Sequence, residues 1–210
     1  MSNLCNCLHE FARSLPRRDY TFAKSQLPKN GIYFVFEKGE VGHGGDRIVR
    51  VGTHTGDNNL PKRLKEHFIT ENKDRSIFRK NIGRAILNKV NDPFLQYWNE
   101  DLTSRASKLK FGDSEYNARR VEVEKQVTQY MQKNLSFSVF PVETKVERLE
   151  LEAKIISTVS MCKLCGPSPK WLGNNSPELK IKNSGLWLSQ HLNGQILSID
   201  NCMRIKGSID

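Results

Sequence analysis

Two residues four positions apart, Arg63 and His67, have the side chains and the spacing for chemistry on a phosphate group. Residues at i and i+4 lie on the same face of a helix. Arginine offers a planar, permanently charged donor to phosphate oxygens, and histidine can carry a proton near neutral pH. A helix histidine is more often structural, and a helix arginine more often faces solvent, so both explanations stay open.

Tyr33 and Glu152 are two further candidates for chemistry. A tyrosine can orient or deprotonate water if a neighbouring cation lowers its pKa, although strand tyrosines usually serve packing. A glutamate can hold a hard divalent cation, although most helix glutamates simply face solvent. Glu150 is the alternative to Glu152.

The chain of 210 residues is basic, with 33 Lys+Arg against 23 Asp+Glu and a formal net charge of +10. Residues 60–90 contain nine basic and three acidic residues, so much of the excess lies there. This excess predicts a polyanionic partner. A solvated helix face is the simpler explanation of a local charge run.

The composition, 37% hydrophobic and 27% charged, is that of a globular protein. No stretch approaches about 18 consecutive apolar residues, which excludes a transmembrane helix, and we expect no membrane partner. The segment from Met1 to Leu15 has no apolar stretch behind a basic one, which argues against a secretory signal. We therefore expect a cytoplasmic protein.

The five cysteines are Cys5, Cys7, Cys162, Cys165 and Cys202. An odd number without a secretory signal argues against disulfides and favours reduced thiols. Cys162 and Cys165 have zinc-knuckle spacing, and Cys5 and Cys7, with His9 nearby, could complete a site. Because a C-x-C pair is a poorer partner than a second C-x-x-C pair, we do not expect structural zinc on Cys162 and Cys165.

The elements that must position these side chains follow from the apolar spacing. Helical spacing predicts helices over about 3–15, 60–68, 76–88, 119–133 and 147–160. β-Branched and aromatic runs predict strands over about 32–36, 47–52 and 135–142. The first two strands would form a hairpin around a glycine-rich turn, residues 39–46.

These elements predict an α/β fold, a small three-stranded and mainly antiparallel sheet flanked by helices. Residues 91–133 would be an inserted helical segment, irregular over 91–118. In the helix over 76–88 we expect five apolar side chains to face inward, those of Ile77, Phe78, Ile82, Ala85 and Ile86. In the loop-rich tail, Trp171, Trp187 and Leu188 would anchor the packing.

Several short motifs occur in order along the chain. Gly31-Ile32-Tyr33 opens the first strand, and Arg50-Val51-Gly52 closes the second. The next motif is the helix with Arg63 and His67. It is followed by the segments Leu151–Ile156 and Trp171–Pro177. Over about residues 31–176 this order resembles the GIY-YIG nuclease superfamily, in particular uncharacterised bacterial members with an Arg-Val-Gly-Thr-His second motif. Residues 1–30 would be an N-terminal helix and linker, and 177–210 an extension packed on the same domain.

The resemblance implies a divalent-metal-dependent endonuclease that hydrolyses DNA phosphodiester bonds. Glu152 would hold one Mg²⁺ or Mn²⁺, and Arg63 would bind the scissile phosphate. Tyr33 would orient or deprotonate the water, and His67 would bind the phosphate or carry a proton. The residues expected to contact the nucleic acid are Arg50, His54, Lys62, Arg79, Lys80, Arg84, Asn174 and Asn175.

The second motif departs from the family's pattern, because Arg50 stands where the family has a tyrosine proposed as general base. An arginine is always protonated and cannot accept a proton. Arg50 would bind phosphate instead, and Tyr33, with His67 or His54, would act as the base.

Three alternatives follow: a catalytically impaired nucleic-acid-binding module on the same fold, a defence or toxin-like nuclease subunit that needs a partner protein, and a basic protein-interaction domain. RNA as substrate and a homodimer also stay open.

Overall fold

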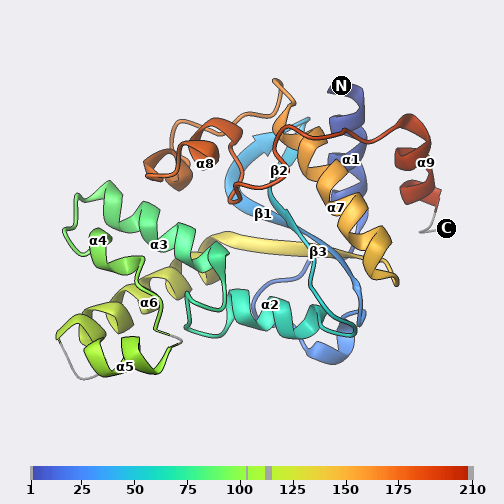
Figure 1. Ribbon diagram of the computed structural model, residues 1–210. Coiled ribbons are helices and arrows are strands. Elements are labelled where there is room, and N and C mark those ends of the chain that lie inside the picture. Colours follow the sequence, from blue (N-terminus) through green and yellow to red (C-terminus); the bar gives the residue numbers. More distant parts are fainter. Residues whose placement is uncertain (1, 103, 112–114, 208–210) are drawn as a thin grey trace.

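A three-stranded antiparallel sheet lies at the centre of the protein (Figure 1), in a computed structural model that describes residues 2–102, 104–111 and 115–207. The strands are β1 (Gly31–Gly42), β2 (Gly45–Gly52) and β3 (Leu135–Pro141). Their order is β2-β1-β3, so β1 pairs with both neighbours. The sheet and its flanking helices confirm the predicted fold class.

The β1–β2 hairpin is longer than the sequence predicts. The turn is confined to His43 and Gly44, which have φ values of 51° and 75°, as a two-residue hairpin turn requires. Residues 39–42 and 45–46, which the sequence places in the turn, belong to the strands. Pairing of Val35 with Arg50 and of Phe36 with Ile48 places a bulge at Val49.

Both faces of the sheet are covered, which explains why β1 is apolar at successive positions. Tyr33 and Val35 belong to one hydrophobic core, and Ile32, Phe34 and Phe36 belong to the other. The first core is shared with α2 (Leu60–Phe68), α3 (Ile77–Lys89) and α6 (Glu115–Asn134). The second is shared with α1 (Ser2–Ser14), α7 (Lys145–Ser160) and α9 (Ile199–Gly207).

Short helical segments complete the described part of the chain. They are η1 (Lys24–Gln26), α4 (Leu95–Trp98), α5 (Arg105–Phe111), η2 (Leu172–Asn175) and α8 (Leu179–Ser184). The expected insertion therefore contains α4, α5 and most of α6, a helix that begins slightly before the predicted residue 119.

Side-chain caps begin the two helices that flank the candidate site. The Ser76 hydroxyl accepts the Arg79 backbone N–H at the start of α3, and Thr144 accepts Glu147 N–H at the start of α7. The expected inward orientation of Ile77 is wrong, because its side chain is 48% exposed. As the first residue of α3, Ile77 lies beyond the part of the helix that packs on the core.

The tail packs on the sheet through its tryptophans, as predicted. Trp171 and Trp187 are buried, and their indole N–H groups donate to Glu37 Oε2 over 3.0 and 2.8 Å. The Trp187 backbone N–H donates to Val49 O over 2.7 Å, at the bulge of β2. The tail is thereby held against β2, next to Arg50.

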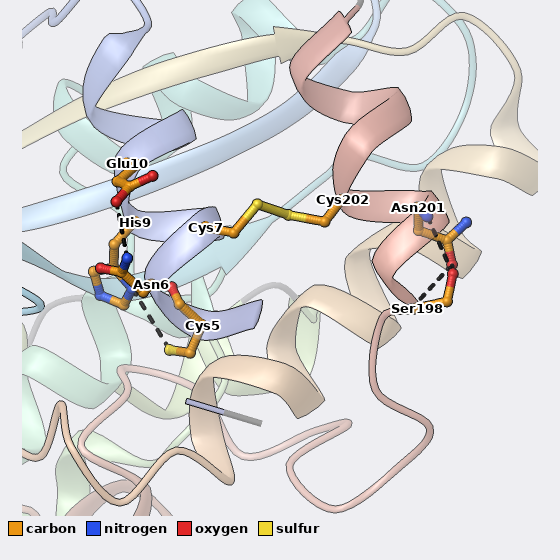
Figure 2. Close-up of a disulfide and its surroundings, with 8 residues drawn as sticks. All are labelled: Cys5, Asn6, Cys7, His9, Glu10, Ser198, Asn201 and Cys202. Carbon is orange, nitrogen blue, oxygen red and sulfur yellow. Dashed lines mark hydrogen bonds between the residues drawn. A yellow bond between two sulfur atoms is a disulfide. The ribbon is translucent and has the colours of Figure 1, made fainter. Parts of the chain in front are cut away.

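A disulfide joins Cys7 of α1 to Cys202 of α9, two residues 195 positions apart (Figure 2). The expectation of reduced thiols is therefore wrong for this pair, because the sequence does not show that the first and last helices lie side by side. Cys5, Cys162 and Cys165 are free and buried. Within the described ranges, no helix is both long and apolar enough to cross a membrane.

Candidate active site

Two motif positions, 31 and 52, require glycine because other groups lie too close to the backbone for a side chain to fit. Tyr33 pairs with Gly52 across the hairpin. A Cβ on Gly52 would lie 2.3 Å from the Tyr33 hydroxyl oxygen, and one on Gly31 would lie 2.4 Å from the Phe140 carbonyl oxygen. A larger residue at position 52 would displace the Tyr33 phenol.

Tyr33 forms a buried hydrogen-bonded chain with His67 and Ser76. The Tyr33 hydroxyl lies 2.8 Å from His67 Nε2, and His67 Nδ1 lies 2.7 Å from Ser76 Oγ. Burial lowers the pKa of His67 well below 6.5, and the charges of Arg63 and Arg50 lower it further. The imidazole is therefore neutral at pH 7, with one donor and one acceptor nitrogen to link the two hydroxyls.

Glu152 of α7 binds the backbone that follows β2. Its Oε1 accepts the Thr53 N–H over 2.9 Å, directly after the glycine beneath Tyr33. Burial raises the pKa of Glu152, and the charge of Arg50 opposes that shift without cancelling it. Glu150, by contrast, has a side chain that is 61% exposed and pairs with Lys154 over 2.6 Å.

Glu152 and Arg50 line one cavity of about 230 Å³. The Arg50 guanidinium lies 4.7 Å from the Phe78 ring centroid and donates from Nη1 to Trp187 O. Its Nε is buried and has no hydrogen-bond partner in the described part of the chain. Unpaired buried donors are rare, and this one would have to turn toward the cavity to reach an anion there.

The cavity also contains oxygen donors that suit a hard divalent cation. Asn81 and Ser189 line it together with Glu152, although the Asn81 Oδ1 already accepts the Arg84 Nη1–H over 2.9 Å. Magnesium binds proteins through one or two carboxylates and keeps several waters. The lining therefore fits an Mg²⁺ or Mn²⁺ ion held by Glu152.

Arg63 lies near this group on α2. Its side chain is 25% exposed, and its Nη1 donates to Arg75 O over 2.8 Å. Its charge lowers the pKa of both His67 and Glu152, which places it near both. Tyr33 of β1 and His67 of α2 are hydrogen-bonded to each other, and Glu152 of α7 lines the cavity, whereas Tyr33, Arg63 and His67 do not line it.

Two residues expected to contact nucleic acid are buried instead. Arg79 is fully buried, pairs with Glu124 over 2.9 Å and donates to the backbone O of His67. His54 is 3% exposed, and its Nε2 accepts the Gly31 N–H over 3.4 Å. Neither side chain is available to a phosphate, so both expectations are wrong.

The other expected contacts have varied surroundings. The Asn174 and Asn175 side chains donate to Ser168 O and Leu172 O, which stabilises the η2 loop. They do not line the Glu152 cavity, so they do not brace a metal there. Lys80 donates to Asn99 O over 2.8 Å, and Arg84 pairs with Glu178 over 3.2 Å.

Lys62 is exposed on α2, the helix that carries Arg63. Its contact with a phosphate backbone stays a prediction.

Four polar cavity residues were not anticipated from the sequence: Asn81, Ser189, Gln190 and His191. Asn81 lies one helical turn after Ile77, whose unexpected exposure marks the cavity rim. His191 is exposed and has a φ of 58°, and its charge favours the ionised form of Glu152. The signal that could have found them is the polar run Ser189-Gln190-His191 directly after the buried Trp187 and Leu188.

Comparison with known proteins assigns this arrangement to a family. The sequence model of the GIY-YIG domain matches residues 4–198, which is most of the chain. No curated protein and no solved structure matches the chain. The protein belongs to the GIY-YIG domain family, whose members are generally nucleases.

Proposed function

We propose that this protein is a divalent-metal-dependent endonuclease that hydrolyses DNA phosphodiester bonds in the cavity between Glu152 and Arg50. One observation carries the proposal: Glu152 and Arg50, a carboxylate and a guanidinium, line the same small cavity. The hydrogen-bonded pair of Tyr33 and His67 lies directly behind it, across Gly52 and Thr53.

The two arginines near the cavity would bind the phosphate. Negative charge on phosphate oxygens grows toward the transition state, and fixed guanidinium donors stabilise it more than the ground state. Arg50 is held in place by its bond to Trp187 O and by the Phe78 ring. Arg63 is partly exposed and would contact the phosphate from the side of α2.

Tyr33 is buried and does not line the cavity, so a water would reach its oxygen only when the site opens. Tyr33 would then accept the proton of the attacking water. In the tautomer suited to this step, the Tyr33 O–H donates to His67 Nε2, and His67 Nδ1–H donates to Ser76 Oγ. When the Tyr33 oxygen takes the water proton, its own proton passes to Nε2, and His67 becomes an imidazolium. Because His67 starts neutral, this lone pair is available at pH 7.

Glu152 would hold the Mg²⁺ or Mn²⁺ ion. The ion supplies positive charge to the phosphate and to the leaving 3′ oxygen. A carboxylate must be ionised to bind it, and the raised pKa of Glu152 moves that requirement to higher pH than for an ordinary glutamate.

A nucleic-acid-binding module without cutting activity is the second candidate. Arg50 in place of the family's tyrosine favours it. The cavity would still bind a phosphate, but it would lack the tyrosine proposed as general base. RNA as the substrate, a homodimer and a partner protein are variants of either candidate.

The deciding experiment incubates supercoiled plasmid with the full chain, with and without Mg²⁺ or Mn²⁺. We expect metal-dependent nicking that Glu152→Ala reduces by about 10²-fold or more while DNA affinity is kept. Glu150→Ala, two positions away and exposed, is the matched control and should cut normally.

Each other outcome selects an alternative. Salt-dependent DNA binding without cutting by any variant would favour the binding module. Cutting that appears only with an added protein would favour a subunit that needs a partner. A chain without salt-dependent DNA binding would be a protein-interaction domain.

A further inference from the structure

Five side chains that can bind metals meet in the second core, away from the Glu152 cavity. They are Cys5 and His9 of α1, His43 of the hairpin turn, and Cys162 and Cys165 of the loop after α7. Figure 2 shows Cys5 pointing away from the Cys7–Cys202 disulfide. Ligand atoms of Cys5, His9, His43 and Cys165 all lie within 4.8 Å of one another.

Cys162 joins the same cluster. It is not one of the four residues whose ligand atoms all lie within 4.8 Å of one another, but its Sγ lies 3.4 Å from His43 Nε2. The Cys5 and Cys165 sulfur atoms are 3.5 Å apart. In a tetrahedral site with Zn–S of about 2.3 Å and Zn–N of about 2.0 Å, neighbouring ligand atoms lie about 3.3–3.8 Å apart. The Cys5–Cys165 and Cys162–His43 separations fall in this range, as binding of one zinc ion requires.

Five candidates compete for four positions, and hydrogen bonding excludes His9. Its Nδ1 lies 2.9 Å from the Cys5 carbonyl oxygen, an acceptor, so Nδ1 carries the proton. Its Nε2 accepts the Ile48 backbone N–H over 3.1 Å. A neutral imidazole has only one lone pair on nitrogen, and here the backbone occupies it. His9 instead fixes the α1 backbone at Cys5.

We infer that Cys5, His43, Cys162 and Cys165 bind one structural zinc ion. Three cysteines and one histidine are a common closed zinc set, and the spacing of Cys162 and Cys165 matches a zinc knuckle. The sequence disfavoured such a site because Cys7 seemed to be the remaining partner. Cys7 is in the disulfide, and His43 occupies the fourth position.

The zinc would link three segments that are distant in the sequence: α1, the hairpin turn and the loop after α7. A closed site of this type contributes folding free energy and has no open position for substrate. Its sulfur ligands select zinc, whereas the oxygen donors around Glu152 select magnesium or manganese. The inference is therefore independent of the proposed nuclease activity.

The test measures zinc in the full chain, produced without a histidine tag, by mass spectrometry. We expect about one zinc per chain. Cys5→Ser, Cys162→Ser and His43→Gln should each lower the content severalfold. Cys202→Ser, which opens the disulfide but leaves the cluster, and His9→Gln should both retain it.

Two results would overturn the inference. A wild-type chain that holds no zinc and takes up none after reduction would exclude the site. Zinc retained by Cys162→Ser but lost from His9→Gln would replace the proposed ligand set. If a cysteine variant does not fold, cobalt is added to the metal-free wild-type chain instead. We expect the spectrum of tetrahedral Co²⁺ with thiolate charge-transfer bands. Absence of these bands would contradict the site.

Discussion

Arg79–Glu124 and Arg50–Glu152 combine the same two residue types in opposite ways. Arg79 and Glu124 are buried side by side at 2.9 Å, and the Arg79 guanidinium also donates to Thr128 Oγ1 and His67 O. Arg50 and Glu152 face a shared cavity, and Arg50 Nε lacks a partner in the described part of the chain. The first pair is saturated by the protein, whereas under the proposed function the second would bind a ligand.

This difference separates structural charge from functional charge. A buried pair whose hydrogen bonds are complete stabilises one arrangement of helices and offers nothing to a substrate. A guanidinium held in place but not saturated is preorganised for an anion. The basic segment 60–90 contains the saturated Arg79, so its net charge overstates the surface available to a phosphate backbone.

The largest expected effect tests the saturated pair. Arg79→Met leaves Glu124 buried without its cation, which should lower the free energy of unfolding by about 3–5 kcal/mol. Urea denaturation measures the change. The double variant Arg79→Met/Glu124→Leu should recover much of the loss, because no unpaired charge remains. A loss below about 1 kcal/mol in the single variant would mean that the pair is not saturated as described.

The next effect tests the unsaturated pair. Arg50→Met should reduce plasmid cutting by about 10²–10³-fold, as removal of a fixed transition-state donor does. It should also move the acid limb of the pH–rate profile to higher pH. The charge of Arg50 lowers the pKa of Glu152, so its removal raises that pKa and protonates the carboxylate sooner as the pH falls. An unchanged rate and acid limb would separate Arg50 from the site.

A smaller effect concerns the connection between the hairpin and the site. Gly52→Ala places a methyl group 2.3 Å from the Tyr33 hydroxyl. The phenol must leave His67, which should cost about 1–3 kcal/mol of stability and reduce cutting. Gly166→Ala is the control, since a Cβ there would meet nothing within 4 Å. Equal stability and activity of the two variants would refute the proposed packing of Tyr33.

The smallest effect concerns the exposed lysine of α2. Lys62→Ala should weaken DNA binding equally across sequences and reduce the salt dependence by about one phosphate contact. Lys89→Ala, exposed on α3 and lining a different cavity, should leave the salt slope unchanged. Identical slopes for both variants would place the DNA elsewhere on the surface.

Local patterns predicted most of the fold. Leu60, Leu64 and Phe68 are all buried, as their helical spacing requires, and the strand runs gave the correct sheet. Sequence patterns within one segment did not predict the role of a residue whose partner lies far away in the sequence. Nothing near Arg79 shows that Glu124 lies beside it, and nothing near Cys7 shows that Cys202 does.

The candidate site was predicted in part for the same reason. Motif order indicated Tyr33, Arg63, His67 and Glu152; in the structure Tyr33 is hydrogen-bonded to His67 and Glu152 lines the cavity, and the shared role of the four stays a prediction. The tail residues of the cavity wall were missed, because they reach it only through the packing of Trp187 on β2. Long-range packing also determined that His54 faces inward.

The most direct test of the central claim compares Glu152→Gln with the wild-type chain in metal-dependent plasmid nicking at equal DNA occupancy. The substitution keeps the size of the side chain and an oxygen for the Thr53 N–H but removes the charge that would hold the metal. We predict normal folding and DNA affinity with nicking slower by about 10²-fold or more. Nicking at the wild-type rate would contradict the assignment of this cavity as the active site.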